Sequence, residues 1–142
     1  MLLTKDMIKE GLDDALAPAS RDLEWSRTLG RASYEVMWSV APYYRDLILE
    51  SNFYPSNEEH RRQILRLHAR PVEVFCWCPV DEARRRYVER AQQRHPVHVA
   101  TDLEVDRFRD WEQPMGLGPV IMVNTRGPVD VGNLAEQVLR TL

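Results

Sequence analysis

Apolar residues recur along the chain with two spacings, one typical of amphipathic helices and the other of short buried strands. Helical spacing covers three segments: Asp6–Leu16, Arg21–Tyr44 and Val131–Leu142. A serine followed three residues later by a glutamate, Ser56-x-x-Glu59, forms a capping box and predicts the start of another helix. An arginine-rich stretch, Asp81–Arg94, predicts a further helix that ends just before Pro96. These segments make up the helical part of the expected fold.

Short, mostly apolar segments lie between the helices and predict four strands. They are Met1–Thr4, Asp46–Glu50, Pro71–Pro79 and Val120–Val123. Strands that alternate with helices of about ten or more residues indicate an α/β fold with a mainly parallel sheet. We therefore expect a three-layer sandwich around a sheet of about four strands. In such sheets ligands bind beyond the carboxyl ends of the strands, so the residues that follow each strand are the candidates for a site.

Composition narrows the class of protein. The 142 residues are 44% hydrophobic and 29% charged, with a net charge of -3. These values exclude a disordered chain, and no apolar run approaches the roughly 20 residues that a membrane helix needs. The basic excess of a general nucleic-acid or anionic-membrane binder is absent. We expect a cytoplasmic protein that forms one domain over residues 1–142.

Two cysteines, Cys76 and Cys78, form a C-x-C motif in the third predicted strand. On a strand both would point to the same face, and they are too close in sequence for an ordinary disulfide. They could form half of a zinc site with His68, His95 or His98, but no second C-x-x-C or H-x₃₋₅-H motif completes it. Two buried, reduced thiols are therefore the expected state.

The basic residues are almost all arginines. Of the 19 lysines and arginines only Lys5 and Lys9 are lysines, and neither follows a glycine. The chain therefore contains no phosphate loop of the form G-x-x-x-x-G-K-[ST]. It also lacks the dinucleotide-binding pattern G-x-G-x-x-G.

At the predicted strand ends the sequence resembles the P-loop kinase-like ATPases of the AAA-type group. This group includes polynucleotide kinase, zeta toxin and chloramphenicol phosphotransferase relatives. Four segments carry the resemblance, in the family's order: Leu3–Glu10, Leu49–Phe53, Cys76–Pro79 leading into Arg86–Pro96, and Val123–Thr125 followed by Pro128–Asp130. Together they span nearly the whole chain.

The resemblance implies a P-loop NTPase-like domain that lacks its N-terminal part. Family members begin with a strand, a phosphate loop and a helix, a unit of roughly 30 residues, whereas residue 1 here already stands at the family's second strand. The family's missing strand would lie between the strands at 46–50 and 71–78. We expect these two strands to pair directly and close the sheet, with a homodimer through exposed sheet edges as a further expectation. A second chain in the gap and a marginally stable chain are the alternatives.

The resemblance also implies roles for residues after the first two strands. Asp6 would contact the acceptor hydroxyl or take its proton, although a carboxylate there could simply cap the helix. Lys5 and Asn52 would bind the substrate, while a solvated lysine is the simpler interpretation of Lys5. Glu50 would hold a water of the Mg²⁺ shell, the alternative being an acid that faces solvent at a strand end.

Further roles fall on the last half of the chain. Arg86, Arg90 and Arg94 recur every four residues, and the resemblance implies a lid helix that closes over the triphosphate of ATP. The same run could be an ordinary solvated helix face. Thr125 and Arg126 would lie against the adenine, or form only a turn. The segment 101–117 would shape the acceptor pocket.

Three functions follow from these observations. The first is an ATP- and Mg²⁺-dependent kinase that phosphorylates an unidentified hydroxyl-bearing acceptor, with this chain inactive or weakly active because nothing replaces the phosphate loop. The second is a non-catalytic binding or assembly module that keeps the substrate half of the fold. The third, an arginine-mediated RNA binder, is disfavoured by the net charge, so nucleic acid is expected only as a kinase substrate. The sequence leaves open whether the chain is itself an enzyme.

Overall fold

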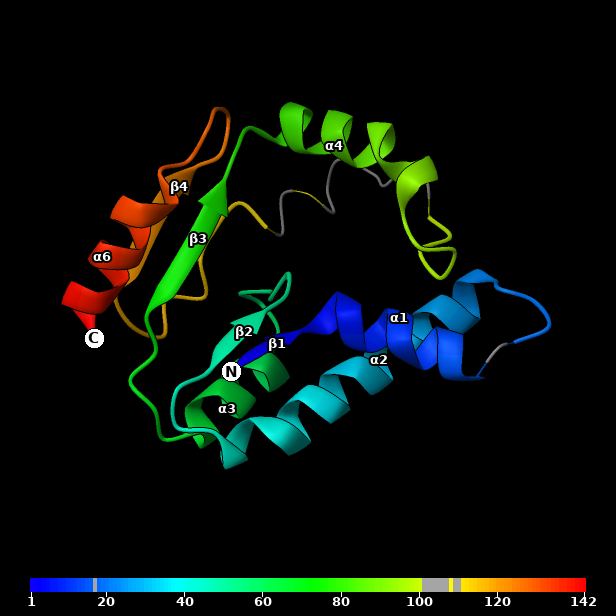
Figure 1. Cartoon of the computed structure of the whole chain (residues 1–142), viewed down its shortest axis with the longest axis horizontal. Coiled ribbons are helices and arrows are strands. Elements are labelled where there is room, and N and C mark those ends of the chain that lie inside the picture. Colours follow the sequence, from blue (N-terminus) through cyan, green and yellow to red (C-terminus); the bar gives the residue numbers. More distant parts are fainter. Residues whose placement is uncertain (17, 101–107, 109–110) are drawn as a thin grey trace. The chain divides into compact units, whose positions relative to one another are not determined.

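Figure 1 shows the chain as a computed structural model that describes residues 1–16, 18–100, 108 and 111–142. The chain divides into two compact units. The first unit comprises Met1–Asn52 with Val88–Asp102, and the second comprises Phe53–Tyr87 with Leu103–Leu142. Of the segment 101–117 expected to shape the acceptor pocket, residues 101–107 and 109–110 lie outside the described residues.

The first unit is a pair of helices attached to a small parallel sheet. Its elements are β1 (Leu2–Thr4), α1 (Lys5–Leu16), α2 (Leu23–Val40), the 3₁₀ turn η1 (Ala41–Tyr43), β2 (Ile48–Glu50) and the 3₁₀ turn η2 (Ala91–Gln93). Strand β1 pairs in parallel with β2, so that Thr4 lies opposite Glu50. The N-terminal ammonium donates a hydrogen bond to the carbonyl of Asp46 at 2.9 Å. Helix α1 follows β1 directly and packs along α2 (Figure 1).

Local sequence explains the ends of α2. Asp22 caps its N-terminus, because the side chain accepts a hydrogen bond from the backbone N–H of Trp25 at 2.7 Å. The helix ends at Val40 rather than at Tyr44, since Pro42 has no N–H to donate and the chain tightens there into η1. Leu29 and Met37 supply the buried apolar face expected from the sequence.

The surface that α1 buries is polar. Its two buried residues are Lys9 and Asp13, which meet Ser26 and Trp25 of α2, whereas Leu16 is exposed. The apolar periodicity of α1 therefore predicts a helix correctly but does not identify the face that packs on α2.

The second unit contains the longer parallel pair. Its elements are α3 (Glu58–Arg66), β3 (Glu73–Trp77), α4 (Val80–Glu89, which crosses the boundary between the units at Val88), β4 (Val120–Asn124) and α6 (Val131–Thr141). The register of β3 and β4 runs from Glu73 opposite Val120 to Trp77 opposite Asn124. Gly118 precedes β4 at a point of close approach, where a Cβ would lie 2.1 Å from the carbonyl oxygen of Pro71.

The strands confirm a mixed α/β fold with parallel pairing but form two sheets. Within the described residues β1 pairs only with β2, and β3 pairs only with β4. The described residues therefore show two separate strand pairs and do not confirm the expected pairing of the strands at 46–50 and 71–78 in one four-stranded sheet. Strand β2 has only three residues, which gives it a short hydrogen-bonding ladder to offer a further partner.

Two helix boundaries also differ from expectation. Helix α3 is capped by Asn57, not Ser56, because the Asn57 side chain accepts hydrogen bonds from the N–H groups of Glu59 and His60. Helix α4 ends at Glu89, and Arg94 adopts an extended conformation after η2. The arginine-rich helix is thus shorter than the sequence predicts.

The expectation that both cysteines are buried is wrong. Phe75 and Trp77 are half-buried on one face of β3, while Val74 and Cys76 are exposed on the other. Cys78 lies beyond the strand and is half-buried. None of the helices among the described residues combines the length and the apolar character needed to cross a membrane.

Candidate functional site

The carboxyl ends of β1 and β2 gather the charged residues that the sequence singles out in the first unit. Because α1 begins directly after β1, Lys5 and Asp6 occupy its first turn. The Lys5 Nζ donates a hydrogen bond to Asp6 Oδ1 at 3.0 Å. Asp6 is the second residue of the helix, so the interpretation that it caps the helix from outside is wrong. The two side chains form an ion pair at the end of the strand.

Asp6 is held in its ionised form. Burial would raise the pKa of its carboxyl, but the charge and hydrogen bond of Lys5, together with the charges of His98 and Lys9, outweigh burial and lower the pKa. A carboxylate that stays ionised at neutral pH can accept a hydrogen bond from a hydroxyl group.

Glu50 has the opposite electrostatic character. It ends β2 opposite Thr4 and is exposed there, as the alternative of a solvent-facing acid expects. Partial desolvation followed by the negative charge of Asp6 still raises its pKa, and Lys5 opposes this rise. The pKa values of Asp6 and Glu50, at the carboxyl ends of neighbouring strands, are thus shifted in opposite directions. Such a separation is often found where one acid donates and the other accepts a proton.

Tyr34 of α2 also lies at these strand ends, and no motif in the sequence marks it as a site residue. The Tyr34 hydroxyl lies 2.7 Å from Ser51 Oγ and donates a longer hydrogen bond, 3.4 Å, to the carbonyl of Asn52. Its ring centroid lies 6.0 Å from Lys5 Nζ. Tyr34 thus contacts Lys5 through its ring and Ser51 and Asn52 through its hydroxyl.

Lys9 and His98 also act on Asp6 and were missed as site residues. The Lys9 Nζ donates to Ser26 Oγ at 2.8 Å, and burial followed by the charge of Lys5 lowers its pKa to about 8. Lys9 lies three residues after Asp6, so helical spacing could have placed both on one face. His98 carries no motif in the sequence, yet its side chain is only 5% exposed and its Nε2 lies 2.9 Å from Glu10 Oε1.

The three arginines predicted to share a lid helix do not share a helix face, because α4 ends before Arg90 and Arg94. Arg86 belongs to the second unit, whereas Arg90 and Arg94 belong to the first. The charge of Arg94 acts on Lys9 and His98, lowering the pKa of each. The lid role of these arginines stays a prediction.

Arg86 connects α4 to the turn after β4. Its Nε donates to Glu82 Oε1 at 2.5 Å, and its Nη1 and Nη2 donate to the carbonyls of Thr125 at 2.9 Å and Arg126 at 3.4 Å. Hydrogen bonds from Arg85 and Arg86 lower the pKa of Glu82 to about 2. Arg86, Thr125 and Arg126 therefore meet in the second unit, and their role in holding a nucleotide stays a prediction.

The turn itself is closely tied to the sheet. Both the N–H and the hydroxyl of Thr125 donate to the carbonyl of Trp77, at 2.8 and 3.0 Å, and the N–H of Arg126 donates to Asn124 Oδ1 at 3.0 Å. Arg126 also lines a depression of about 430 Å³ together with Pro79, Asp81, Glu82 and Arg85. An open surface for a ligand thus adjoins the predicted adenine contact.

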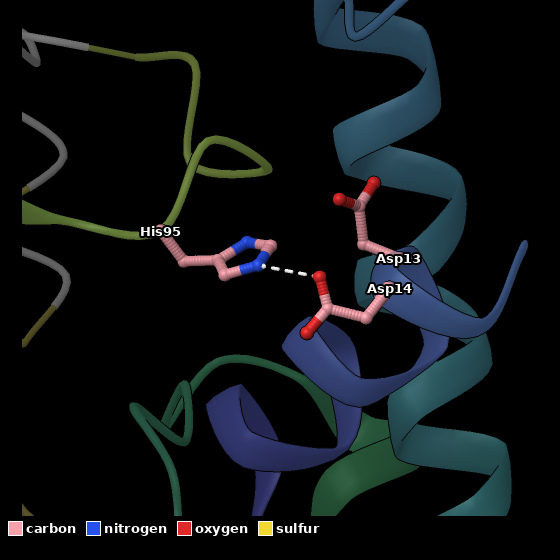
Figure 2. A group of neighbouring side chains, drawn as sticks. All are labelled: Asp13, Asp14 and His95. Carbon is pink, nitrogen blue, oxygen red and sulfur yellow. Dashed lines mark hydrogen bonds and ion pairs between the residues drawn. The ribbon is translucent and has the colours of Figure 1, made fainter. Parts of the chain in front are cut away.

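One group in the described residues has the spacing of a metal site, and Figure 2 shows it: Asp13, Asp14 and His95. Its hydrogen bonds argue against a metal. Asp13 is fully buried, and its oxygens accept from Arg21 Nε and Trp25 Nε1, both at 2.6 Å. The guanidinium of Arg21 already supplies the positive charge.

The tautomer of His95 also argues against a bound metal in this group. Its Nδ1 accepts a hydrogen bond from the N–H of Val97 at 3.2 Å, so the ring proton lies on Nε2, which faces Asp14 Oδ1 at 3.1 Å. A protonated Nε2 donates and has no lone pair for a metal. The group is therefore an ion-pair cluster, and neither Glu50 nor the cysteines belong to it.

The comparisons with known proteins bear on the fold. No protein-family model and no curated protein matches the sequence. The crystal structure of a "putative kinase" from Chloroflexus aurantiacus J-10-fl matches 99% of this chain and 83% of its own chain, with a TM-score of 0.74 and 26% sequence identity. The chain is thus similar in fold to a protein assigned to the kinases, which confirms the kinase resemblance at this coarser level.

Proposed function

We propose that this chain is a P-loop kinase-like protein whose first unit binds the hydroxyl acceptor of an ATP-dependent phosphoryl transfer. One observation carries the proposal: Lys5 holds Asp6 ionised at the carboxyl end of a parallel strand pair, in a chain similar in fold to the Chloroflexus protein. Ligands in α/β folds bind at this end of the strands. An anionic carboxylate there suits a hydroxyl group, whose proton it can accept.

Asp6 acts on the acceptor oxygen in this scheme. Its carboxylate accepts a hydrogen bond from the hydroxyl, directs the oxygen for in-line attack and receives the proton as the phosphoryl group is transferred. Lys5 keeps the carboxylate ionised and oriented. Asn52, which follows β2 and accepts a hydrogen bond from Tyr34, would supply a further polar contact to the acceptor. These residues do not supply donors for the β- and γ-phosphates.

Glu50 and the second unit would hold the remaining reactants. Burial and then the negative charge of Asp6 raise the pKa of Glu50, and a dication nearby would favour its ionised form, so Glu50 fits the role of holding a water of the Mg²⁺ shell. Mg²⁺, when bound, neutralises charge on the transferred phosphate. Arg126 beside its depression fits the base of ATP. Because the sequence contains no G-x-x-x-x-G-K-[ST], we expect weak or no turnover by these 142 residues.

Binding and turnover should be measured separately. Titration calorimetry with a non-hydrolysable ATP analogue, with and without Mg²⁺, tests the nucleotide site, and Arg126→Ala is the matched variant. We expect weak binding that Mg²⁺ strengthens and that Arg126→Ala reduces. ATP turnover at an ordinary kinase rate would contradict the weak-activity expectation. Absence of analogue binding at millimolar concentration would contradict the nucleotide site.

The alternative, a non-catalytic assembly module, is favoured by a different observation. Each strand pair has edges that carry no strand partner among the described residues, and such edges readily pair with another chain. The exposed apolar residues include Ile48 on β2 and Met122 on β4. Sedimentation velocity over a hundredfold range of concentration tests this function: a stable dimer without nucleotide binding supports it, and a monomer that binds ATP analogue rejects it.

A further inference from the structure

We infer that Tyr34 is a positioning residue of the acceptor site, which its ring and its hydroxyl serve in two separate ways. The ring confines the Lys5 ammonium against Asp6, and the hydroxyl fixes the residues that follow β2. The inference rests on the proposed function for its purpose, but its geometry stands without any ligand.

The ring of Tyr34 faces the Lys5 ammonium. The Nζ of Lys5 lies 6.0 Å from the ring centroid and 3.0 Å from Asp6 Oδ1. A lysine ammonium at this distance from an aromatic face is attracted by the ring quadrupole. The Lys5 side chain is only 15% exposed, so the attraction acts in a partly desolvated position. Without the ring, a flexible lysine stem would have more conformations in which it does not reach Asp6.

The ring is itself held in place. It stacks on Trp38, one turn further along α2, with a centroid separation of 6.1 Å and an interplanar angle of 17°. Trp38 is buried, so the stack gives the tyrosine a rigid support. The orientation of Tyr34 is therefore set by the core of the first unit.

The hydroxyl of Tyr34 reaches the other strand of the pair. It lies 2.7 Å from Ser51 Oγ and donates to the Asn52 carbonyl at 3.4 Å. Residues 51 and 52 follow Glu50 directly and lie outside β2, so the strand ladder does not fix them. One side chain thus ties the residues after β1 to those after β2, and these are the two segments that bear the predicted acceptor contacts.

The test uses the unliganded chain, so its outcome is independent of nucleotide binding and turnover. Carbon-detected NMR titration of the Asp6 carboxyl is measured in wild type, Tyr34→Leu, Tyr34→Phe and the neighbouring solvent-facing control Glu35→Gln. We expect Tyr34→Leu to raise the pKa of Asp6, because Lys5 is released, and Tyr34→Phe and Glu35→Gln to leave it unchanged. An unchanged Asp6 titration in folded Tyr34→Leu would overturn the role of the ring.

A double-mutant cycle shows whether the ring acts through Lys5. In a Lys5→Met background Tyr34→Leu should have no further effect on the Asp6 pKa, whereas the same rise in both backgrounds would overturn the inference. If Tyr34→Leu does not fold, the wild-type protein provides the test. The chemical shifts of its Lys5 Hε protons should be moved upfield by the ring current of Tyr34, and random-coil values would overturn the role of the ring.

Backbone order parameters from NMR relaxation test the hydroxyl. Tyr34→Phe removes only the oxygen that contacts Ser51 Oγ and the Asn52 carbonyl, so the order parameters of residues 51 and 52 should fall from about 0.85 to below about 0.6, while those of the rest of the first unit stay unchanged. Glu35→Gln should leave both positions unchanged. Unchanged order parameters in Tyr34→Phe would overturn the hydroxyl's part in positioning Asn52.

Discussion

The ammonium of Lys9 and the hydroxyl of Ser26 lie 2.8 Å apart between α1 and α2, with Lys9 only 6% exposed. Burial of a cation whose hydrogen bond goes to a neutral hydroxyl lowers the stability of the first unit. It stands one helical turn from Asp13, whose carboxylate accepts from Arg21 and Trp25. A polar network thus joins the two helices behind Asp6.

Titration of Lys9 should make the free energy of unfolding depend on pH in the alkaline range. Burial and then the charge of Lys5 lower its pKa from 10.5 to about 8. Between these values the unfolded chain binds the proton and the folded chain does not, so the free energy of unfolding should rise with pH from about 8 to 10.5. Lys9→Met should be more stable than wild type at pH 7 and should lack this rise. Urea unfolding at several pH values measures both effects.

Ser26→Ala is the matched control for Lys9. It leaves the ammonium buried without its hydroxyl partner, so it should lower the free energy of unfolding at pH 7 by about 1–3 kcal/mol. If the free energy of unfolding rises between about pH 8 and 10.5 as much in Lys9→Met as in wild type, Lys9 is not the titrating group.

Asp13 should be the most sensitive acid of the first unit. Burial would raise its pKa, but hydrogen bonds from Trp25 and Arg21 outweigh burial and lower it. Its stabilising effect is therefore present above the pKa of an unfolded aspartate and is lost as pH falls through the lower folded value. Asp13→Asn should reduce the free energy of unfolding at pH 7 by about 3 kcal/mol, because it leaves Arg21 without its carboxylate.

Urea unfolding of Asp14→Asn provides the comparison for Asp13→Asn. Asp14 is exposed, so its loss should change stability by less than about 1 kcal/mol. Similar losses in the two variants would contradict the importance given to the buried carboxylate.

Metal ions should leave the Asp13, Asp14 and His95 group unaffected. The Nε2 proton of His95 and the guanidinium of Arg21 oppose a bound cation. Thermal unfolding should give the same Tm with EDTA as with added Zn²⁺ or Mn²⁺. A rise in Tm with either metal that disappears in His95→Gln would refute this assignment.

His98 should weaken the fold in acid. Burial is the main cause of its lowered pKa, and it outweighs the hydrogen bond that the ring donates to Glu10. The unfolded chain therefore takes up a proton at higher pH than the folded chain, and stability should fall as pH drops from about 6.5 through the folded value. His98→Gln should reduce this loss, as measured by urea unfolding from pH 7.5 to pH 5.

His68→Asn is the control for the acid effect, since asparagine accepts the positive φ of 50° at this position. It should keep the wild-type pH dependence. His60 is also buried with a lowered pKa, so His98→Gln is expected to reduce the loss without abolishing it. If the free energy of unfolding falls equally with decreasing pH in wild type and in His98→Gln, His98 does not cause the loss of stability in acid.

Sequence alone identified the helices and strands and the residues that follow them. Asp6 and Glu50 could be selected because strand ends are local features, marked by where an apolar run stops. The burial of Lys9, Asp13 and His98 could not be predicted this way, because it depends on packing against residues 8 to 88 positions away. Tyr34 carries no motif, and only the position of α2 beside the ends of β1 and β2 brings it to Lys5.

Periodicity and turn residues, which act over a few positions, thus predicted the α/β class and the order of the elements. The sequence itself also shows that these residues contain no G-x-x-x-x-G-K-[ST] loop. Tertiary structure decided which strands pair, where α4 stops and which polar groups are buried. Strand pairing depends on backbone hydrogen bonds between distant segments, and apolar patterning shows that a strand forms without showing which strand it pairs with. For that reason two parallel pairs formed where one four-stranded sheet had been expected.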